Sequence, residues 1–334
     1  MPDANALEAA ARAALDPAVH AFYAGGTGPA DAAAWARVGL RPRVLRDVAA
    51  VDTATTVLGV PVASPVLAAP VALLGLAHPG GEAAWAAGVA AAGGLRVLST
   101  RTTTAIAAVA DAAPGAPWWF QVYVMRDRGL TAELVRRAAA AGAGALVLTG
   151  DTPRVAARAP LEVPAGGYMP DLPGDLRRDP RAFQDPRTTF ADVAWLREVS
   201  GGLPVLVKGV LRGDDARACL AAGAAGVIVS NHGGRQLAGA VAPAAALPEV
   251  ADAVAGEAEV LVDGGIATGV DVLRALALGA RAVLVGRPLV WALATGGGDG
   301  VRAFLDELRA ELEEALALAG ATSPADAGRD LVQR

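Results

Sequence analysis

The chain has 334 residues, of which 54% are hydrophobic, and its formal net charge is −5. The apolar fraction is enough for a substantial core and argues against disorder. The negative charge and the lack of a basic run argue against a general nucleic-acid binder.

Cys219 is the only cysteine, which excludes an intramolecular disulfide and fits a reducing compartment. No stretch approaches the ~18 uncharged apolar residues of a membrane span. The N-terminus also lacks a basic segment before an apolar core. These features predict a soluble, cytoplasmic protein that binds neither membranes nor nucleic acid.

The first predicted elements are two helices at 4–14 and 16–24, followed by a small hairpin around Gly59. From residue 65, short apolar runs and helical patterns then alternate eight times. Strands are predicted at 65–69, 96–99, 118–124, 145–149, 204–207, 226–229, 259–262 and 282–285. Helices are predicted at 82–92, 104–112, 130–141, 190–199, 214–222, 244–255, 270–278 and 289–294.

Eight strand–helix repeats predict an α/β fold, a (β/α)8 TIM barrel of about 250 residues. A doubly wound open sheet is the alternative, but its glycine-rich phosphate loop would follow the first strand, where that fingerprint is missing. We expect a single domain over 1–334, with an N-terminal helical segment at 1–50 and the barrel at about 64–296. A lid loop is expected at 152–189 and a C-terminal helix at 300–320.

The most informative stretch is 226–237, GVIVSNHGGRQL, in which a buried strand leads into a glycine-rich turn. The turn carries His232 and Arg235, three residues apart. A histidine pKa of about 6.5 suits proton abstraction near neutrality, and the planar guanidinium fork matches a carboxylate. Together the two residues predict a site in which the histidine removes a proton next to the carboxylate of a ligand and the arginine binds that carboxylate. A loop histidine and a surface arginine with no such role are the alternative.

Polar residues or glycines stand at nearly every predicted strand end, where barrel enzymes carry their chemistry. Buried polar groups are costly unless satisfied, so their convergence predicts a large polar ligand. Lys208 should face an anion or an electron-rich ring. The loops Asp263-Gly264-Gly265 and Gly286-Arg287 follow strands seven and eight, where phosphate sites are common. Taken singly, each loop also fits an ordinary turn.

These residues resemble the FMN-dependent 2-hydroxy acid oxidase and dehydrogenase family, which includes glycolate, lactate and mandelate enzymes. SNHGGRQL is the most specific motif, supported by FQVYV, LTGDTPR, VLVKGV and ALALGARAVLVGRP, over about residues 22–320. The resemblance implies FMN as cofactor, oxidation of a small L-2-hydroxy acid to the 2-oxo acid, and a homo-oligomer, often a tetramer. No metal site is predicted.

The resemblance also implies individual roles. His232 would be the base, Asp151 its supporting carboxylate and Tyr123 a substrate hydrogen-bond partner. Arg235 would be the main carboxylate clamp and Arg158 a second arginine from the lid side. Cofactor-binding positions would be Val71, Ala72, Ser99, Gln121, Thr149, Lys208, Ser230, Asp263, Gly264, Gly265, Gly286 and Arg287.

Four positions depart from the family pattern. Phe22 replaces a frequent tyrosine that touches the substrate carboxylate, which favours larger or more apolar substrates, and Val71 replaces a frequent threonine beside the flavin. Ala267 replaces a phosphate-binding arginine, and Arg101 replaces a bulky apolar residue near the substrate side chain. We hypothesise that Arg101 contacts an anionic substrate and offsets the missing hydroxyl at Phe22. In the alternative, Arg101 points to solvent.

Two other functions compete with oxidation. One is a flavoprotein of the same fold without net redox turnover, such as a flavin-dependent isomerase, but the His232–Arg235 pair suits a carboxylate substrate. The other is a flavin-binding protein whose catalysis has decayed. Retention of His232, Asp151, Arg235 and Lys208 argues against decay.

Overall fold

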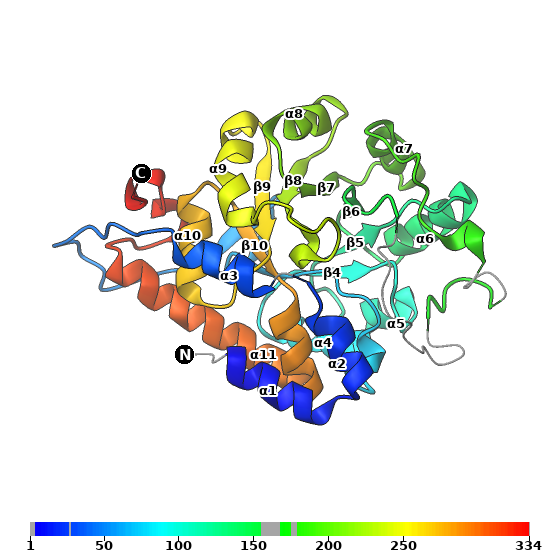
Figure 1. The fold of residues 1–334 in the computed structure, drawn as a ribbon, viewed down its shortest axis with the longest axis horizontal. Helices are drawn as coiled ribbons and strands as arrows, with labels where there is room; N and C mark the ends of the chain where they lie inside the picture. The colour runs from blue at the N-terminus through cyan, green and yellow to red at the C-terminus, as the bar shows by residue number, and fades with distance from the viewer. Residues whose placement is uncertain (1–3, 27, 155–167, 175–178, 334) are drawn as a thin grey trace.

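A closed barrel of eight parallel strands forms the centre of the computed structural model, which describes residues 4–26, 28–154, 168–174 and 179–333 (Figure 1). The strands are β3 (Val66–Ala68), β4 (Arg96–Ser99), β5 (Trp118–Val122), β6 (Leu146–Thr149), β7 (Val205–Val210), β8 (Gly226–Val229), β9 (Glu259–Asp263) and β10 (Ala282–Val285). Consecutive strands pair in parallel, and β10 pairs with β3 to close the ring. The predicted TIM barrel is therefore confirmed, and the open-sheet alternative is wrong.

The barrel interior is filled by alternate residues of the strands. Val97, Trp119, Val147 and Leu206 belong to one buried cluster, whereas their neighbour Leu98 belongs to the cluster that includes the helices. Successive side chains of a strand point to opposite faces, and here both faces are covered. This explains why the strands read in the sequence as continuous apolar runs.

Helices surround the barrel in the order predicted from the alternation (Figure 1). They are α4 (Gly81–Ala91), α5 (Ile106–Asp111), α6 (Arg128–Ala140), α7 (Ala191–Val199), α8 (Gly213–Ala221), α9 (Pro243–Val254), α10 (Gly269–Ala277) and α11 (Arg287–Leu318). The helices predicted at 289–294 and 300–320 adjoin within α11 at a kink, because Gly297 has non-helical angles (φ 57°, ψ −145°). Short 3-10 turns occur at η1 (Leu74–Leu76), η2 (Pro180–Ala182), η3 (His232–Gly234), η4 (Pro324–Asp326) and η5 (Arg329–Leu331).

The N-terminal segment contains α1 (Ala4–Ala14), α2 (Pro17–Ala24) and α3 (Gly28–Ala36), and α1 and α2 pack beside α11 (Figure 1). Asp16 caps α2 by accepting a hydrogen bond from the Ala18 amide. The sequence did not predict α3. Residues 37–50 contain no helix, so the helical part is shorter than the expected segment 1–50.

A two-stranded hairpin, β1 (Thr55–Val57) and β2 (Val60–Val62), closes the N-terminal end of the barrel. Val57 and Val62 join the interior cluster. The Leu58 amide donates to Glu259 at the start of β9 (2.8 Å), and the Arg281 side chain donates to the Thr56 carbonyl oxygen (2.7 Å). With that end covered, the carboxyl ends of the strands form the mouth of the barrel.

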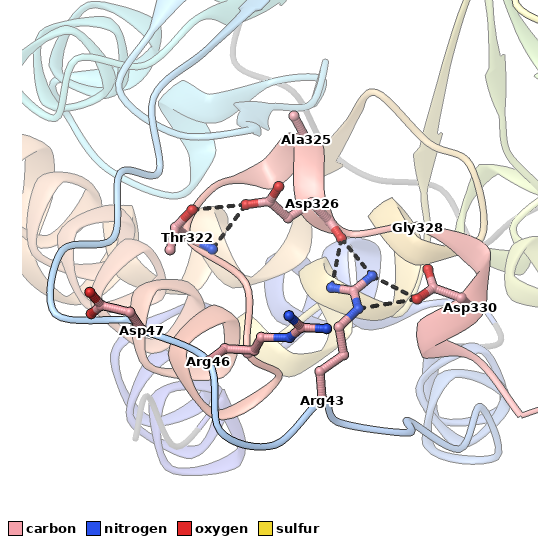
Figure 2. Close-up of a pocket in the computed structure, with 9 residues that line it drawn as sticks. Arg43, Arg46, Asp47, Thr322, Ala325, Asp326, Gly328 and Asp330 are labelled. Carbon is pink, nitrogen blue, oxygen red and sulfur yellow. Dashed lines mark hydrogen bonds and ion pairs between the residues drawn. The ribbon is translucent and has the colours of Figure 1, made fainter.

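A cavity of about 580 Å³ lies away from the predicted site, between residues 43–47 and the C-terminal segment (Figure 2). There Arg43 pairs with Asp330 (2.7 Å) and donates to the Asp326 carbonyl oxygen. None of the predicted site residues that the structure describes lines this cavity. Among the described residues, no helix has the length and apolar character needed to cross a membrane.

Candidate active site

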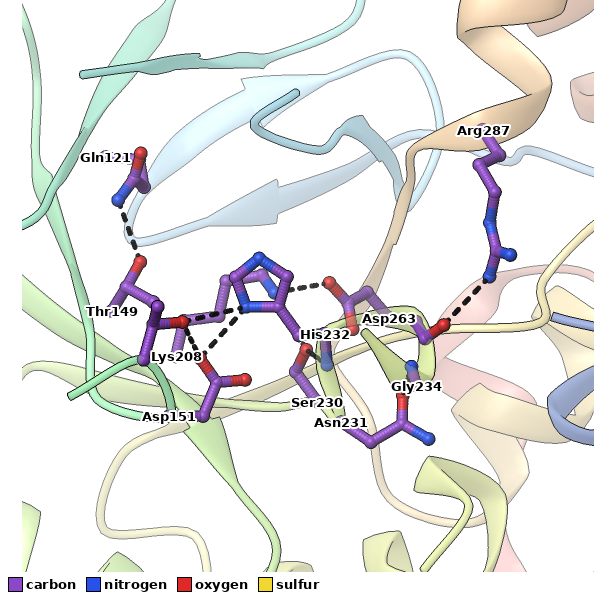
Figure 3. Close-up of polar contacts among 12 residues, drawn as sticks. Gln121, Thr149, Asp151, Lys208, Ser230, Asn231, His232, Gly234, Asp263 and Arg287 are labelled. Atoms are coloured by element: carbon purple, nitrogen blue, oxygen red, sulfur yellow. Dashed lines mark hydrogen bonds and ion pairs between the residues drawn. The ribbon is translucent and has the colours of Figure 1, made fainter. Parts of the chain in front are cut away.

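The predicted site residues come from the carboxyl ends of most barrel strands and meet at the mouth (Figure 3). Ser99, Thr149 and Asp263 are the last residues of β4, β6 and β9, and Gln121 lies near the end of β5. Lys208 lies within β7, and Ser230 and Gly286 directly follow β8 and β10. Arg158 lies outside the described residues.

His232 and Asp151 form the central contact of the site, with 2.9 Å between His232 Nδ1 and Asp151 Oδ1 (Figure 3). His232 begins the turn η3 with a positive φ of 60°, and its amide donates to Ser230 Oγ (3.0 Å). Burial by itself would raise the pKa of Asp151. The hydrogen bond to His232, together with the Lys208 ammonium, outweighs burial and holds this pKa below its ordinary value.

Two residues that the sequence reasoning missed, Thr152 and Gln236, complete this contact. Thr152 Oγ1 donates to Asp151 Oδ1 (3.1 Å) and lies 3.4 Å from His232 Nδ1. Gln236 donates to the same Thr152 oxygen (3.0 Å). Thr152 lies in the motif LTGDTPR and Gln236 in SNHGGRQL. Their positions next to Asp151 and Arg235 in the sequence could have identified them as site residues.

Lys208 is almost fully buried and is paired within the barrel (Figure 3). Its ammonium lies 2.7 Å from Asp263 Oδ2 and donates to Ser230 Oγ (2.7 Å). Burial would lower the pKa of Lys208, but the carboxylates of Asp263 and Asp151 outweigh burial and raise it. The raised pKa keeps the buried Lys208 ammonium protonated, and Asp263 is its ion-pair partner. The other oxygen of Asp263 is buried and has no hydrogen-bond partner among the residues that the structure describes.

A chain of side-chain hydrogen bonds connects the neighbouring strands β4, β5 and β6. Ser99 Oγ donates to the side-chain oxygen Gln121 Oε1 (3.1 Å), and Gln121 Nε2 donates to Thr149 Oγ1 (2.9 Å). All three residues are buried. This chain fixes the orientation of the Gln121 side chain, so its amide is presented to the mouth in one arrangement.

The glycine loops are packed closely against the N-terminal segment. The Trp35 indole donates to the Gly264 carbonyl oxygen (2.7 Å), and a Cβ on Gly265 would lie 2.5 Å from the backbone of Asp31. Asn231 donates to Asp31 across the same contact (2.8 Å). The unpredicted helix α3 therefore supports the loop after β9.

Arg287 begins α11 directly after Gly286 and reaches the turn η3 (Figure 3). Its guanidinium makes a long hydrogen bond of 3.4 Å to the Gly233 carbonyl oxygen. Burial lowers the pKa of Arg287, and carboxylates including Asp31 and Asp263 partly oppose that effect. Positive charge at a helix N-terminus suits an anion such as phosphate.

Arg235 reaches across to the end of α2. Its guanidinium donates to the backbone oxygens of Phe22, Tyr23 and Gly25 and lies over the Phe22 ring, 5.2 Å from the ring centre. Both the backbone oxygen and the ring of Phe22 therefore help to hold Arg235 in place. The Tyr23 hydroxyl is used elsewhere, since it donates to the Leu73 carbonyl oxygen (2.6 Å).

Arg101 does not point to solvent, so that alternative is wrong. Its guanidinium donates to Gln184 Oε1 (2.7 Å) and lies over the rings of Tyr123 (5.5 Å) and Tyr168 (5.6 Å). Burial raises the pKa of Tyr123, and the charge of Arg101 partly opposes that effect. The raised pKa keeps the phenol of Tyr123 neutral, and this phenol also interacts with the Thr152 side chain.

The remaining predicted positions lie at the rim. Val71 and Ala72 follow β3 and are partly exposed, and a Cβ on Gly286 would stand 3.8 Å from the Val71 side chain. Ala267 is held by its amide, which donates to Asp271 Oδ2 (3.3 Å) at the start of α10. Because residue 267 is an alanine, this position offers no guanidinium to a phosphate group.

The chain is similar to named enzymes over nearly its whole length. The profile of a family described as FMN-dependent dehydrogenase matches residues 11–334. L-lactate oxidase of Nostoc sp. is 43% identical over 316 residues, covering 88% of this chain and 86% of that protein. Glycolate oxidase of Spinacia oleracea is 40% identical over 341 residues, covering 96% and 92%.

Solved structures agree with these relatives. Mandelate oxidase with (S)-2-phenylpropionate is 41% identical, with a TM-score of 0.90 over 98% of this chain and 96% of that one. Another matching mandelate oxidase structure carries a monooxide adduct of FMN. The predictions of FMN as cofactor and of 2-hydroxy acid oxidation are confirmed, and the isomerase and decayed-protein alternatives find no support. The chain belongs to the FMN-dependent dehydrogenase family.

Proposed function

We propose that this protein oxidises an L-2-hydroxy acid to the 2-oxo acid at the mouth of the barrel, with His232 as the base. The observation that carries this assignment of residues is the 2.9 Å contact between His232 and Asp151. It stands beside a buried Lys208 ammonium, so a proton acceptor and a fixed positive charge share one small region.

The residues present fit FMN. Asp263 offers a buried oxygen that no described residue contacts by a hydrogen bond, which suits a ligand hydroxyl, and Lys208 offers a buried cation. Arg287, with Gly264, Gly265 and Gly286, would hold the phosphate, and Ser99, Gln121, Thr149, Ser230, Val71 and Ala72 would surround the ring. When bound, FMN supplies the acceptor for the two electrons that leave the substrate.

The state of Asp151 determines which histidine nitrogen can act. Because the pKa of Asp151 is lowered, its carboxylate is ionised and accepts the hydrogen bond from Nδ1–H of His232. The free lone pair is therefore on Nε2, which would take the substrate proton. The ionised carboxylate then stabilises the imidazolium that forms.

The substrate would be oriented by neutral and charged donors around that nitrogen. Tyr123 would donate from its phenol, and Arg235 would attract the carboxylate from the end of α2. In this proposal Arg158 would be a second carboxylate partner. The three carbonyl oxygens that hold Arg235 limit its movement, which lowers the entropy cost of using it as a clamp.

Anaerobic spectroscopy of the purified protein tests the proposal. We expect a yellow flavin spectrum that bleaches when an L-2-hydroxy acid is added without oxygen, and stoichiometric 2-oxo acid in the quenched mixture. The D-enantiomer of the same acid is the matched control and should leave the colour unchanged. A flavin spectrum that no member of a broad panel of L-2-hydroxy acids bleaches would contradict the assignment.

We also propose that residues 1–334 act as one domain and that the protein is a cytoplasmic homo-oligomer. The single cysteine, Cys219, is buried, and the exposed apolar residues Val44 and Leu45 offer a surface for self-association. Light scattering coupled to gel filtration would give the mass in solution. A single monomer peak for the FMN-loaded protein would contradict the oligomer.

A further inference from the structure

Arg101 occupies an unusual environment at the mouth of the barrel. Among the described residues its guanidinium contacts three partners, and all are neutral: the Gln184 side-chain oxygen and the rings of Tyr123 and Tyr168. These four residues are called the Arg101 cluster below. A guanidinium carries five N–H donors in a planar fork, and within the described part of the chain only one of these donors is used, by Gln184.

The described residues place no carboxylate within ion-pair distance of Arg101. Asp185, next to Gln184, is already paired with Arg187 (2.9 Å). Arg128 makes a useful comparison, because it also lies over an aromatic ring, that of Trp195, yet is paired with Asp192 at 2.5 Å. Burial lowers the pKa of Arg101, which agrees with a guanidinium that has no carboxylate partner among the described residues.

The Arg101 cluster is firmly built. The Arg101 amide donates to Ser99 Oγ (3.1 Å), and its carbonyl oxygen accepts from the Leu73 amide (2.9 Å). The Met169 amide donates to the Thr102 carbonyl oxygen (2.8 Å), which holds the residue after Tyr168 on the same loop. Gln184 is anchored by a bridge to Met125, just beyond β5.

Tyr123 connects the cluster to the proposed catalytic pair. The charges that affect its phenol include those of Arg101, Asp151 and Lys208. The Arg101 guanidinium lies over the ring of the same residue, 5.5 Å from the ring centre. A 2-hydroxy acid that accepts a hydrogen bond from Tyr123 would therefore lie beside this guanidinium.

We propose that Arg101 is a second anion-binding site, and that the preferred substrates are 2-hydroxy acids with a second anionic group at the end of the side chain. Tyr123 and Tyr168 orient the fork by stacking, and Gln184 fixes one of its donors. The incoming carboxylate supplies the missing counter-charge through charge-assisted hydrogen bonds. This inference rests on the proposed function.

The test compares substrates that differ in charge and little in shape. L-Malate and L-2-hydroxy-4-methylpentanoate end in branches of similar size, one charged and one neutral; L-2-hydroxyglutarate and L-lactate extend the series. Anaerobic flavin bleaching gives kred/Kd for each acid with the wild type, Arg101→Gln, Arg101→Lys and the surface control Arg217→Gln. Spectral titration with 2-oxoglutarate and 2-oxo-4-methylpentanoate measures binding without turnover.

We expect the wild type to favour the dicarboxylates. Arg101→Gln should lower kred/Kd for them by about 10- to 100-fold, while the neutral acids change by less than about 3-fold. Arg101→Lys should retain part of the preference, and Arg217→Gln all of it. A wild type without dicarboxylate preference, or an equal loss on both classes in Arg101→Gln, would overturn the inference. If none of the four acids bleaches the flavin, the inference is overturned; the proposed function fails as well only if the broad panel of L-2-hydroxy acids also leaves the flavin unbleached.

Discussion

The Trp35 indole donates a hydrogen bond of 2.7 Å to the carbonyl oxygen of Gly264, across more than 200 positions of sequence. This bond joins α3, in the N-terminal segment, to the loop after β9. Because that loop would hold part of the cofactor, the packing of α3 becomes a requirement for binding. Gly265, in the loop after β9, lies so close to α3 that an added Cβ would be 2.5 Å from the Asp31 backbone.

Gly265→Ala should therefore loosen both the fold and the cofactor site. The substitution adds a methyl group at a positive φ of 78° and forces it into the backbone of α3. We expect a loss of about 2–4 kcal/mol in unfolding free energy and at least about 10-fold weaker FMN binding. Chemical unfolding of the apoprotein and fluorescence titration with FMN measure the two effects.

Gly59→Ala is the matched control for this substitution. Gly59 has a similar φ of 75°, but nothing lies within 4 Å of the added methyl group. It should cost only the backbone strain, about 1 kcal/mol, and leave FMN affinity unchanged. Equal losses in the two variants would show that contact with α3 does not matter.

His232→Asn should separate cofactor binding from proton transfer. Asparagine tolerates the left-handed backbone that His232 adopts at φ 60°, but it offers no base. We expect full FMN content and anaerobic bleaching slower by about 10²- to 10⁴-fold. His78→Asn, where the new side chain can still accept from the Gly80 amide, is the control. Normal bleaching by the His232 variant would remove this residue from its proposed role.

Asp151 should make the free energy of unfolding depend on pH in the acid range. Its folded pKa is lowered, so an unfolded chain takes up the proton more readily than the folded one. The stabilisation is complete above the ordinary carboxyl pKa, about 3.9, and is lost as pH falls through the lower folded value. Urea unfolding between about pH 5 and 3 should therefore show a steeper loss for the wild type than for Asp151→Asn. Parallel curves would contradict the assignment.

Replacing Arg96, the first residue of β4, with an apolar residue should increase the free energy of unfolding. It is fully buried, and none of its three guanidinium nitrogens has a hydrogen-bond partner among the described residues. Burial lowers the pKa of Arg96 to about 10, so the charge is retained at neutral pH at a cost. Arg96→Met keeps most of the volume and should raise the unfolding free energy by on the order of 2 kcal/mol.

Calorimetry of the FMN-loaded Arg96→Met protein measures this gain, with Arg217→Met on the surface as its control. The surface variant should change little, because its exposed ion pair with Glu257 contributes at most about 1 kcal/mol. A destabilised Arg96→Met variant would mean that the buried guanidinium has a favourable partner in solution.

The sequence alone determined the barrel and the core of its site. Strands such as Arg96–Ser99 and Ala282–Val285 were predicted with the observed bounds, because a strand buried on both faces leaves a local apolar run between turns. His232, Asp151, Lys208 and Asp263 could be assigned to one mouth for a similar reason: in a parallel barrel, all carboxyl strand ends face the same side.

Only the tertiary structure decided what surrounds that core. The helix α3 has a weak local pattern, and its Trp35 and Asp31 are held by partners about 200 residues away. The cluster around Arg101 likewise assembles Tyr168 and Gln184 from a distant loop. Local propensity carries no record of such contacts, since their energy arises only when the chain has closed the barrel and brought these segments together.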